Sequence, residues 1–291
     1  MNKKKQKPRP PRVLIVGTGR AAQGLAHAFR NSGAEVLGLW TRTGRQVAEF
    51  RKLEGTFGRE FTDADAILLC VPDAAVHRTA GWLTAKRLRV KGKVIAHVSG
   101  SLEAGVLAGL KRHGALVAAL HPFFSFAGHT DMRLGDIPFS IEGSKAASSR
   151  VSSLFGPLGL KAAVLDPVNR PLYHAAAVFC SNFPAAFQVA AETLLRDAGF
   201  SAGDSRNMLS ALLGSVVRNV KSRGARASLT GPVVRRDINT IERHFKALSR
   251  HRPSLLPSYS LMTLLLAEYT AANGDAEFME RLGGLITRHG G

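Results

Sequence analysis

Residues 13–24 read Val-Leu-Ile-Val-Gly-Thr-Gly-Arg-Ala-Ala-Gln-Gly and decide the fold of this chain. An apolar run ends at Gly17, and an alanine-rich helical pattern begins within three residues. Gly17 permits a tight turn, Gly19 lets the backbone approach a pyrophosphate, and Ala22 allows close helix–strand packing. The amides at the helix start would face the phosphates, with the positive end of the helix dipole behind them. The stretch predicts a dinucleotide-binding βαβ unit whose cofactor contacts are Gly17, Thr18, Gly19, Arg20, Ala21 and Ala22.

The end of the second predicted strand indicates which dinucleotide would bind. Sites that prefer NAD carry Asp or Glu about 20 residues past the glycines, where the carboxylate accepts hydrogen bonds from the ribose. Here the strand instead ends in Trp40-Thr41-Arg42-Thr43-Gly44-Arg45, without a carboxylate. Because Arg42 can bind a 2′-phosphate bidentately, with Thr41 beside it, we predict NADP (NADPH) rather than NAD. The alternatives are that the arginines belong to a general basic surface, and that the glycine turn binds no ligand.

The composition is that of an ordinary folded protein of 291 residues, with 45% hydrophobic and 21% charged residues. This length suits two domains. No apolar run is long enough to span a bilayer and no secretory segment is evident, so we expect a cytoplasmic protein. Cys70 and Cys180 both lie in apolar surroundings and indicate neither a disulfide framework nor a metal site.

The net charge of +19 is the unusual number in the composition. Residues 1–12 contain six Lys and Arg and no acid, and we expect residues 1–11 to form a disordered basic tail. This tail could contact nucleic acid. The remaining excess is spread over many predicted helices, which favours a solvated surface that attracts anionic ligands. Nucleic acid is therefore an unlikely partner, and a small anionic molecule the expected one.

Periodicity and turn signals predict an α/β fold: an N-terminal Rossmann domain with a doubly wound, mostly parallel sheet, then an all-α domain. After Asp166 the strand signals almost vanish, so we place the NADP-binding domain at 12–166 and a helical substrate or dimerisation domain at 167–291. The predicted strands are 13–16, 35–39, 66–71, 93–98, 115–120, 138–141 and 162–165. The predicted helices of the first domain are 21–30, 45–53, 74–86, 102–112 and 145–155.

The helical half opens with Tyr173–Leu195, a stretch that is apolar nearly all round and predicts a central helix wrapped by others. Spacings of seven and eight would place His174, Ser181 and Asn182 on one stripe of that helix. Three polar groups on such a face indicate a substrate pocket, and hydrogen bonds between helices are the alternative.

Ligands of open α/β sheets bind beyond the carboxyl ends of the strands. At these ends, Val71 and Pro72 could form a wall against the nicotinamide ring. His97 and Ser99 are two residues apart and project to one face of their strand, while His121 ends the next strand. We predict that both histidines contact substrate; the alternatives are a core histidine bonded to backbone at 97 and a loop histidine without a role at 121.

A third polar segment, Leu229-Thr230-Gly231-Pro232, precedes a predicted helix. Thr230 and Arg235 are predicted to bind a substrate carboxylate, because guanidinium suits planar anions. Asp237 is placed as a helix N-cap, which is sufficient to explain it.

These motifs resemble a family of Rossmann-like oxidoreductases with a helical C-terminal domain of unknown function. The motifs are His97-x-Ser99-Gly100, His121-Pro122, Tyr173-His174-Ala-Ala-Ala with Ser181-Asn182, and Leu229-Thr230-Gly231-Pro232 with Arg235 and Asp237. The chain also looks similar to pyrroline-carboxylate reductases, ketopantoate reductases and the 6-phosphogluconate dehydrogenase superfamily. The likeness covers residues 11–285 and implies nicotinamide-dependent reduction in two domains. The family pattern has glycine where this chain has Arg236. The β-hydroxyacid dehydrogenase branch uses a lysine and an asparagine one helical turn apart, and the predicted central helix of this chain contains no lysine.

The combined expectation is an NADP-dependent oxidoreductase that reduces a C=O or C=N bond of a small anionic metabolite. His174 would be the proton donor, since histidine titrates near neutrality, with Asn182 and Ser99 orienting the substrate. The alternatives are a ketopantoate reductase-like enzyme of pantothenate synthesis and a protein that binds NADP without turnover. A homodimer is expected from the apolar helices of the second half and by analogy with related helical domains.

Overall fold

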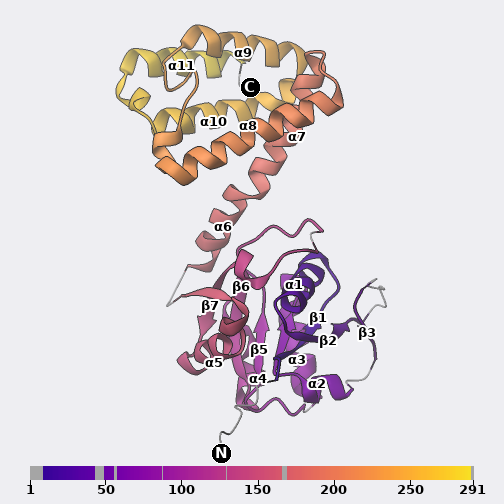
Figure 1. Cartoon of the computed structure of the whole chain (residues 1–291). Helices are drawn as coiled ribbons and strands as arrows, with labels where there is room; N and C mark the ends of the chain where they lie inside the picture. Colours follow the sequence, from indigo (N-terminus) through magenta and orange to yellow (C-terminus); the bar gives the residue numbers. More distant parts are fainter. Residues whose placement is uncertain are drawn as a thin grey trace, which may run out of the picture. The chain divides into compact units, whose positions relative to one another are not determined.

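The computed structural model describes residues 9–42, 49–55, 58–86, 88–128, 130–165 and 169–289 (Figure 1). Most of the predicted basic tail, and the predicted domain boundary after Asp166, lie outside these residues. By its internal contacts the chain divides into two units, Met1–Ser181 and Asn182–Gly291. Helix α6, Arg170–Cys180, therefore belongs to the first unit, where its residues make the contacts described below.

The first unit is built on one eight-stranded sheet in the order β3-β2-β1-β4-β5-β6-β7-β8. Neighbouring strands pair in parallel except β6 and β7, which are antiparallel. The predicted doubly wound, mostly parallel sheet is thus confirmed. The strands are β1 Arg12–Val16, β2 Glu35–Trp40, β3 Lys52–Leu53, β4 Ala66–Leu69, β5 Val94–His97, β6 Leu116–Pro122, β7 Pro138–Gly143 and β8 Lys161–Val164.

Alternate residues of the central strand β1 enter two separate cores, because side chains along a strand point to opposite faces of the sheet. Val13 and Ile15 pack with residues of α1 and α5, whereas Leu14 and Val16 pack with residues of α2, α3 and α4. Helices therefore cover both faces, as the continuous apolar run of β1 predicts. The helices are α1 Arg20–Asn31, α2 Arg59–Asp63, α3 Asp73–Ala85, α4 Ala108–Arg112, α5 Lys145–Phe155 and α6 Arg170–Cys180, with 3₁₀ turns at Ala104–Leu107, Leu134–Asp136 and Gly156–Leu158.

Two expected helices of this unit differ from the structure. The helix predicted over 45–53 is wrong at its end: residues 43–48 lie outside the described residues, and Lys52–Leu53 forms the edge strand β3. Backbone hydrogen bonds join β2 to this segment, from Leu39 N to Arg51 O and from Thr41 N to Leu53 O. The helix predicted over 102–112 is replaced by a 3₁₀ turn and the short α4. Its two glycines, Gly105 and Gly109, each disfavour a continuous helix.

The second unit is all-helical, and its core lies among α9, α10 and α11. Phe245, Leu256 and Leu282 are typical members of this core. The helices are α7 Asn182–Asp197, α8 Ala202–Arg223, α9 Ile238–His251, α10 Leu256–Glu268 and α11 Ala276–His289, with 3₁₀ turns at Arg226–Ser228, Pro253–Leu255 and Ala271–Gly274.

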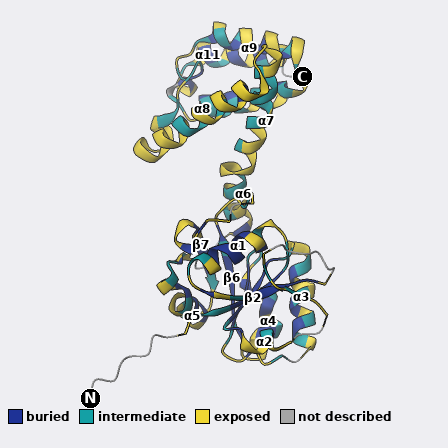
Figure 2. Cartoon of the chain, turned by 45° about the vertical axis from the view of Figure 1, so that its right-hand side comes forward, coloured by how far each residue is buried: buried dark blue, intermediate teal, exposed yellow. Residues whose placement is uncertain are grey.

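The predicted central helix Tyr173–Leu195 is wrong in both continuity and burial. The helix ends at Cys180 and a new one begins at Asn182, with Ser181 at non-helical angles of φ −125° and ψ −62°. A helix cannot run unbroken here, because the Pro184 ring would clash with the carbonyl of Cys180, four residues earlier. None of the α7 residues is buried, and in Figure 2 the neighbouring α8 is coloured mainly as exposed or intermediate.

Candidate functional site

The glycine turn after β1 is shaped so that only glycine fits at its first position. Gly17 has φ 127°, and a Cβ atom built there would lie 2.1 Å from the carbonyl oxygen of Cys70. Gly19 is the N-cap of α1, and a Cβ atom on it would meet nothing within 4 Å. The turn thus packs tightly against β4 on one side. On the other side it leaves open space in front of the free amides of α1, where an anion binds well.

A cavity of about 610 Å³ lies in front of this turn, at the carboxyl ends of β1, β2 and β4. It brings together seven of the predicted cofactor contacts, namely Gly17, Thr18, Gly19, Thr41, Arg42, Val71 and Pro72. Of the other three, Arg20 and Ala21 lie in the first turn of α1, and Ala22 is fully buried against the sheet. The prediction missed a second wall of this cavity, formed by Ala75, Arg78, Thr79 and Trp82 of α3.

A polar cluster lies at the ends of the neighbouring strands. His121 at the end of β6 has its Nδ1 atom 2.7 Å from the hydroxyl of Tyr173 on α6, and the same hydroxyl is 2.8 Å from Ser140 Oγ of β7. His174, the next residue of α6, has its ring centroid 6.4 Å from that of His121. We call these four residues the His121 cluster. His121, Ser140 and Tyr173 are far apart in sequence, and two hydrogen bonds at the Tyr173 hydroxyl join them. His174 lies beside His121.

Gly100 allows the two imidazoles of the His121 cluster to approach the loop after β5. A Cβ atom at this position would lie 2.8 Å from His121 Nε2 and 2.8 Å from His174 Cδ2. Both rings therefore face the same stretch of backbone. The positions of Gly100 and His121 were predictable from the sequence, since His-x-Ser-Gly and His-Pro begin at the ends of adjacent strands. Tyr173 and Ser140 carried no such signal, because their contacts depend on how α6 and β7 pack.

The protonation of His121 is fixed by its surroundings. Burial lowers the pKa of His121 to about 4, with the nearby His174 and Arg170 adding repulsion of the charged form. The imidazole is therefore neutral at pH 7. If Tyr173 donates its hydroxyl proton to Nδ1 and accepts one from Ser140, the Nε2 atom carries the hydrogen and is a donor on the side of Gly100.

His97 and Ser99 take structural positions in the described chain. His97 is fully buried in β5, its Nε2 atom lies 3.1 Å from the carbonyl oxygen of Glu103, and burial lowers its pKa. Ser99 Oγ accepts hydrogen bonds from the amides of Ser101 and Leu102, both at 3.2 Å. Ser99 thus closes the turn after β5, and the contact of His97 with the backbone is the kind that its alternative, a bonded core histidine, predicts.

A buried ion pair attaches α6 to the sheet. Arg170 is only 2% exposed, its Nε atom donates to Glu142 Oε2 of β7 at 2.8 Å, and its guanidinium carbon lies 5.7 Å from the centroid of the Tyr173 ring. The other carboxylate oxygen of Glu142 accepts from the amide of Ala104 at 3.0 Å. A buried charge needs such a partner, so this pair fixes the start of α6 and with it Tyr173. No pattern in the sequence singles out Arg170 or Glu142.

The remaining predicted residues lie at the end of the first unit or within the helical unit. Ser181 donates its hydroxyl to the carbonyl of Ala177 at 2.7 Å, Asn182 begins α7, and Thr230 and Arg235 are exposed before α9. The predicted common stripe of His174, Ser181 and Asn182 is wrong, because the helix breaks at Ser181. Asp237 is the N-cap of α9, as the sequence predicts, and accepts a hydrogen bond from Thr240 N at 3.1 Å.

Arg236 stands in a backbone conformation that favours glycine. Its φ is 56°, in the left-handed region, and its guanidinium lies 3.2 Å from Asp275. This conformation explains the glycine of the family pattern at this position. We expect Arg236→Val to lower the free energy of unfolding by about 1–2 kcal/mol, because a β-branched side chain is strained there. Arg236→Gly should stay within about 0.5 kcal/mol of the parent, since relief of strain offsets the loss of an exposed ion pair. Urea unfolding followed by circular dichroism measures both, and equal losses would refute the backbone explanation.

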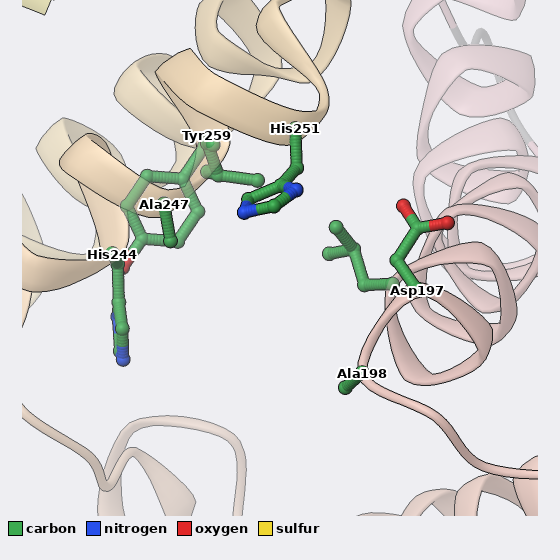
Figure 3. A pocket seen from close by; sticks show the side chains of 8 residues that line it. Asp197, Ala198, His244, Ala247, His251 and Tyr259 are labelled. Carbon is green, nitrogen blue, oxygen red and sulfur yellow. The ribbon is translucent and has the colours of Figure 1, made fainter.

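The helical unit contains a second cavity, of about 510 Å³, that the sequence did not predict (Figure 3). It lies between the end of α7, represented by Asp197 and Ala198, and residues of α9 and α10. Most of its lining is apolar. His244 Nδ1 and the Tyr259 hydroxyl, which are 2.7 Å apart, bond each other. Burial raises the pKa of Tyr259, so this phenol stays protonated at neutral pH.

Among the helices that the structure describes, none has the length and apolar character needed to cross a membrane. Within the same described ranges, no three His, Cys, Asp or Glu side chains gather as a metal site would require.

Comparison with known sequences assigns the two parts of the chain. Residues 2–122 match a Rossmann-like domain, as the sheet order and glycine turn require. Residues 137–265 match a domain of unknown function, DUF2520. The chain therefore combines a Rossmann-like domain with a DUF2520 domain, and the resemblance seen in the motifs is confirmed at this level. No curated protein matches the sequence.

Solved structures share the fold of this chain. A Bacteroides fragilis protein described as an NADP oxidoreductase is 22% identical over 89% of this chain and 99% of its own, with a TM-score of 0.69. Plasmodium falciparum pyrroline carboxylate reductase with NADP bound is 14% identical over 95% and 98%, with a TM-score of 0.60. An imine reductase from Myxococcus stipitatus in complex with NADP⁺ is 17% identical over 91% and 95%, with a TM-score of 0.55. At these identities the likeness is one of fold.

Proposed function

We propose that this protein is an NADP-dependent oxidoreductase that reduces a C=O or C=N bond of a small anionic metabolite. The observation that carries the proposal is the cavity at the glycine turn, whose described lining includes Arg42 and no carboxylate. Arginine without an acidic neighbour suits the 2′-phosphate that distinguishes NADP from NAD. The NADP complexes of the structurally similar pyrroline carboxylate reductase and imine reductase support this choice.

The residues at the turn fit a dinucleotide. The space over Gly19 and the amides of α1 accommodate a diphosphate, and Val71 with Pro72 offers an apolar wall beside it. When bound, NADPH supplies a hydride. The protein must then orient the substrate and provide a proton for its oxygen or nitrogen.

The His121 cluster supplies groups for both tasks. Neutral His121 can donate a hydrogen bond from Nε2 to the substrate heteroatom, because Tyr173 and Ser140 hold the other side of its ring. His174 is exposed beside it and is the proposed proton donor. The roles of the other predicted residues remain predictions. They are Asn182 and Ser99 as groups that orient the substrate, His97 and Ser181 as substrate contacts, and Thr230 with Arg235 as a site for the substrate carboxylate.

The decisive experiment pairs binding with turnover. Calorimetry of the full chain with NADPH should give saturable heat, and NADPH oxidation should be seen with at least one member of a panel of 2-keto acids and cyclic imines. Oxidation with ketopantoate alone would favour the ketopantoate reductase alternative. Tight NADPH binding with no oxidation by any compound would favour a non-catalytic NADP-binding protein, and no binding at all would refute the proposal.

We also propose that the helical unit forms a homodimer. Met208, Leu212, Val216 and Val220 recur every four residues along α8 and are 42–62% exposed. A contiguous apolar stripe of this kind marks an interaction surface, and a two-fold partner would present the same stripe in return.

The double variant Leu212→Glu/Val216→Glu tests the proposed dimer. We expect light scattering to give twice the chain mass of 31.2 kDa for the parent and a single chain mass for the variant, because four glutamates would be buried in the interface. Arg206→Glu, which adds a carboxylate at an exposed polar position of α8, is the control and should remain dimeric. A parent protein that is monomeric at micromolar concentration would contradict the proposal.

A further inference from the structure

Helix α3 presents one face to the cavity at the glycine turn. Ala75, Arg78, Thr79 and Trp82 line it, at the spacing of residues that share a helix stripe. The opposite stripe, with Val76, Ala80 and Leu83, is buried in the core beneath the sheet. This packing fixes the rotation of α3, so Arg78 is held at the cavity by the helix core behind it.

Arg42 and Arg78 are each close in sequence to one of two indole rings that contact each other. Trp40 lies at the end of β2, two residues before Arg42, and Trp82 lies one helical turn after Arg78. The two indoles are in contact in a tilted arrangement, with centroids 4.6 Å apart and an interplanar angle of 35°. Arg42 and Arg78 therefore line the same cavity from two different segments, the residues that follow β2 and the helix α3.

Neither guanidinium is engaged in the part of the chain that the structure describes. No hydrogen bond or ion pair of Arg42 or Arg78 occurs there, although Arg9, Arg12, Arg30 and Arg51 of the same unit all pair with carboxylates. The described cavity lining also lacks any carboxylate. Two uncompensated cations at one cavity favour a dianionic group more strongly than a neutral ribose hydroxyl.

We propose that Arg78 is a second ligand of the adenosine 2′-phosphate and that, with Arg42, it sets the preference for NADP over NAD. This inference rests on the proposed function and adds a specificity residue from α3 to it. Guanidinium groups from two sides can each make charge-assisted hydrogen bonds to separate phosphate oxygens. A 2′-hydroxyl offers no comparable partner, so Arg78 should contribute little to NAD binding.

The test compares ligands that differ only in the 2′-phosphate. Calorimetry of the full chain at fixed ionic strength would use NADP⁺ against NAD⁺, and 2′,5′-ADP against 5′-AMP. For Arg78→Gln we expect NADP⁺ and 2′,5′-ADP affinity to fall about 10- to 100-fold, with NAD⁺ and 5′-AMP affinity changed less than about twofold. Arg42→Gln should act alike, and the double variant should lose the preference.

Arg112→Gln is the matched control, since Arg112 is an exposed arginine in the last turn of α4 and does not line the cavity. It should leave all four affinities unchanged. An unchanged ratio of NADP⁺ affinity to NAD⁺ affinity in Arg78→Gln would overturn the inference, whether both affinities are kept or both fall by the same factor. In either case NADP⁺ binding by the parent would leave the proposed function standing. A parent that binds no nicotinamide nucleotide would overturn both.

Discussion

His174→Gln should lower kcat for the reduced substrate by about 10²–10⁴-fold while the dissociation constant of NADPH stays within about twofold. The reason is that His174 is exposed beside His121 and is not among the residues that line the cavity proposed for the dinucleotide. Glutamine keeps a similar size and hydrogen-bonding ability and removes the imidazole that would donate the proton. Stopped-flow or steady-state NADPH oxidation measures kcat, and calorimetry measures binding.

His113→Gln is the matched control for this experiment. His113 caps the end of α4, before β6 begins, and is therefore at the opposite end of the strand that carries His121. Its replacement should leave both kcat and NADPH binding unchanged. Full turnover by His174→Gln would eliminate this residue as the proton donor and turn attention to Tyr173.

Gly17→Ala should abolish measurable NADPH binding, a loss of at least about 100-fold in affinity. A methyl group at this position would lie 2.1 Å from the carbonyl oxygen of Cys70, so the turn must move away from β4. The φ of 127° adds strain for any residue with a Cβ atom. Calorimetry with NADPH measures the affinity, and thermal unfolding reports the accompanying loss of stability.

Gly19→Ala distinguishes a loss of NADPH binding from a loss of stability at the same turn. Its methyl group would project into the open space over the turn, and the φ of −70° suits alanine, so stability should be kept while NADPH affinity falls. Gly81→Ala on α3, which also meets nothing within 4 Å and does not line the cavity, should change neither property for the worse. Undiminished NADPH affinity in both Gly17→Ala and Gly19→Ala would mean that the turn holds no diphosphate.

The fold of the first unit was predictable because its signals are local. The apolar run before Gly17 fixes β1, and the period of apolar residues over 145–155 predicts α5 with the bounds that the structure has. Strand β3 and helix α2 were missed because two and five residues are too few for a period to emerge. The break at Ser181 is signalled by Pro184, although the apolar composition around it favours a continuous helix.

The candidate site was predictable only where residues follow strands directly. The glycine turn, Arg42 and His121 all lie at or directly after the carboxyl ends of strands, so topology alone brings them to one edge of the sheet. Arg78, Ser140 and Tyr173 reach the same edge through the rotation of α3 and the packing of β7 and α6. No local pattern encodes such tertiary placement.

The buried pair of Arg170 and Glu142 determines where the nucleotide-binding unit can be cut out of the chain. A fragment that stops after residue 166 would leave the Glu142 carboxylate without its cation, and it would also lack Tyr173 and His174. A fragment that continues through Ser181 keeps the ion pair and the whole His121 cluster. Minimal versions of this unit, whether for spectroscopy or for grafting onto other scaffolds, should therefore extend to that residue.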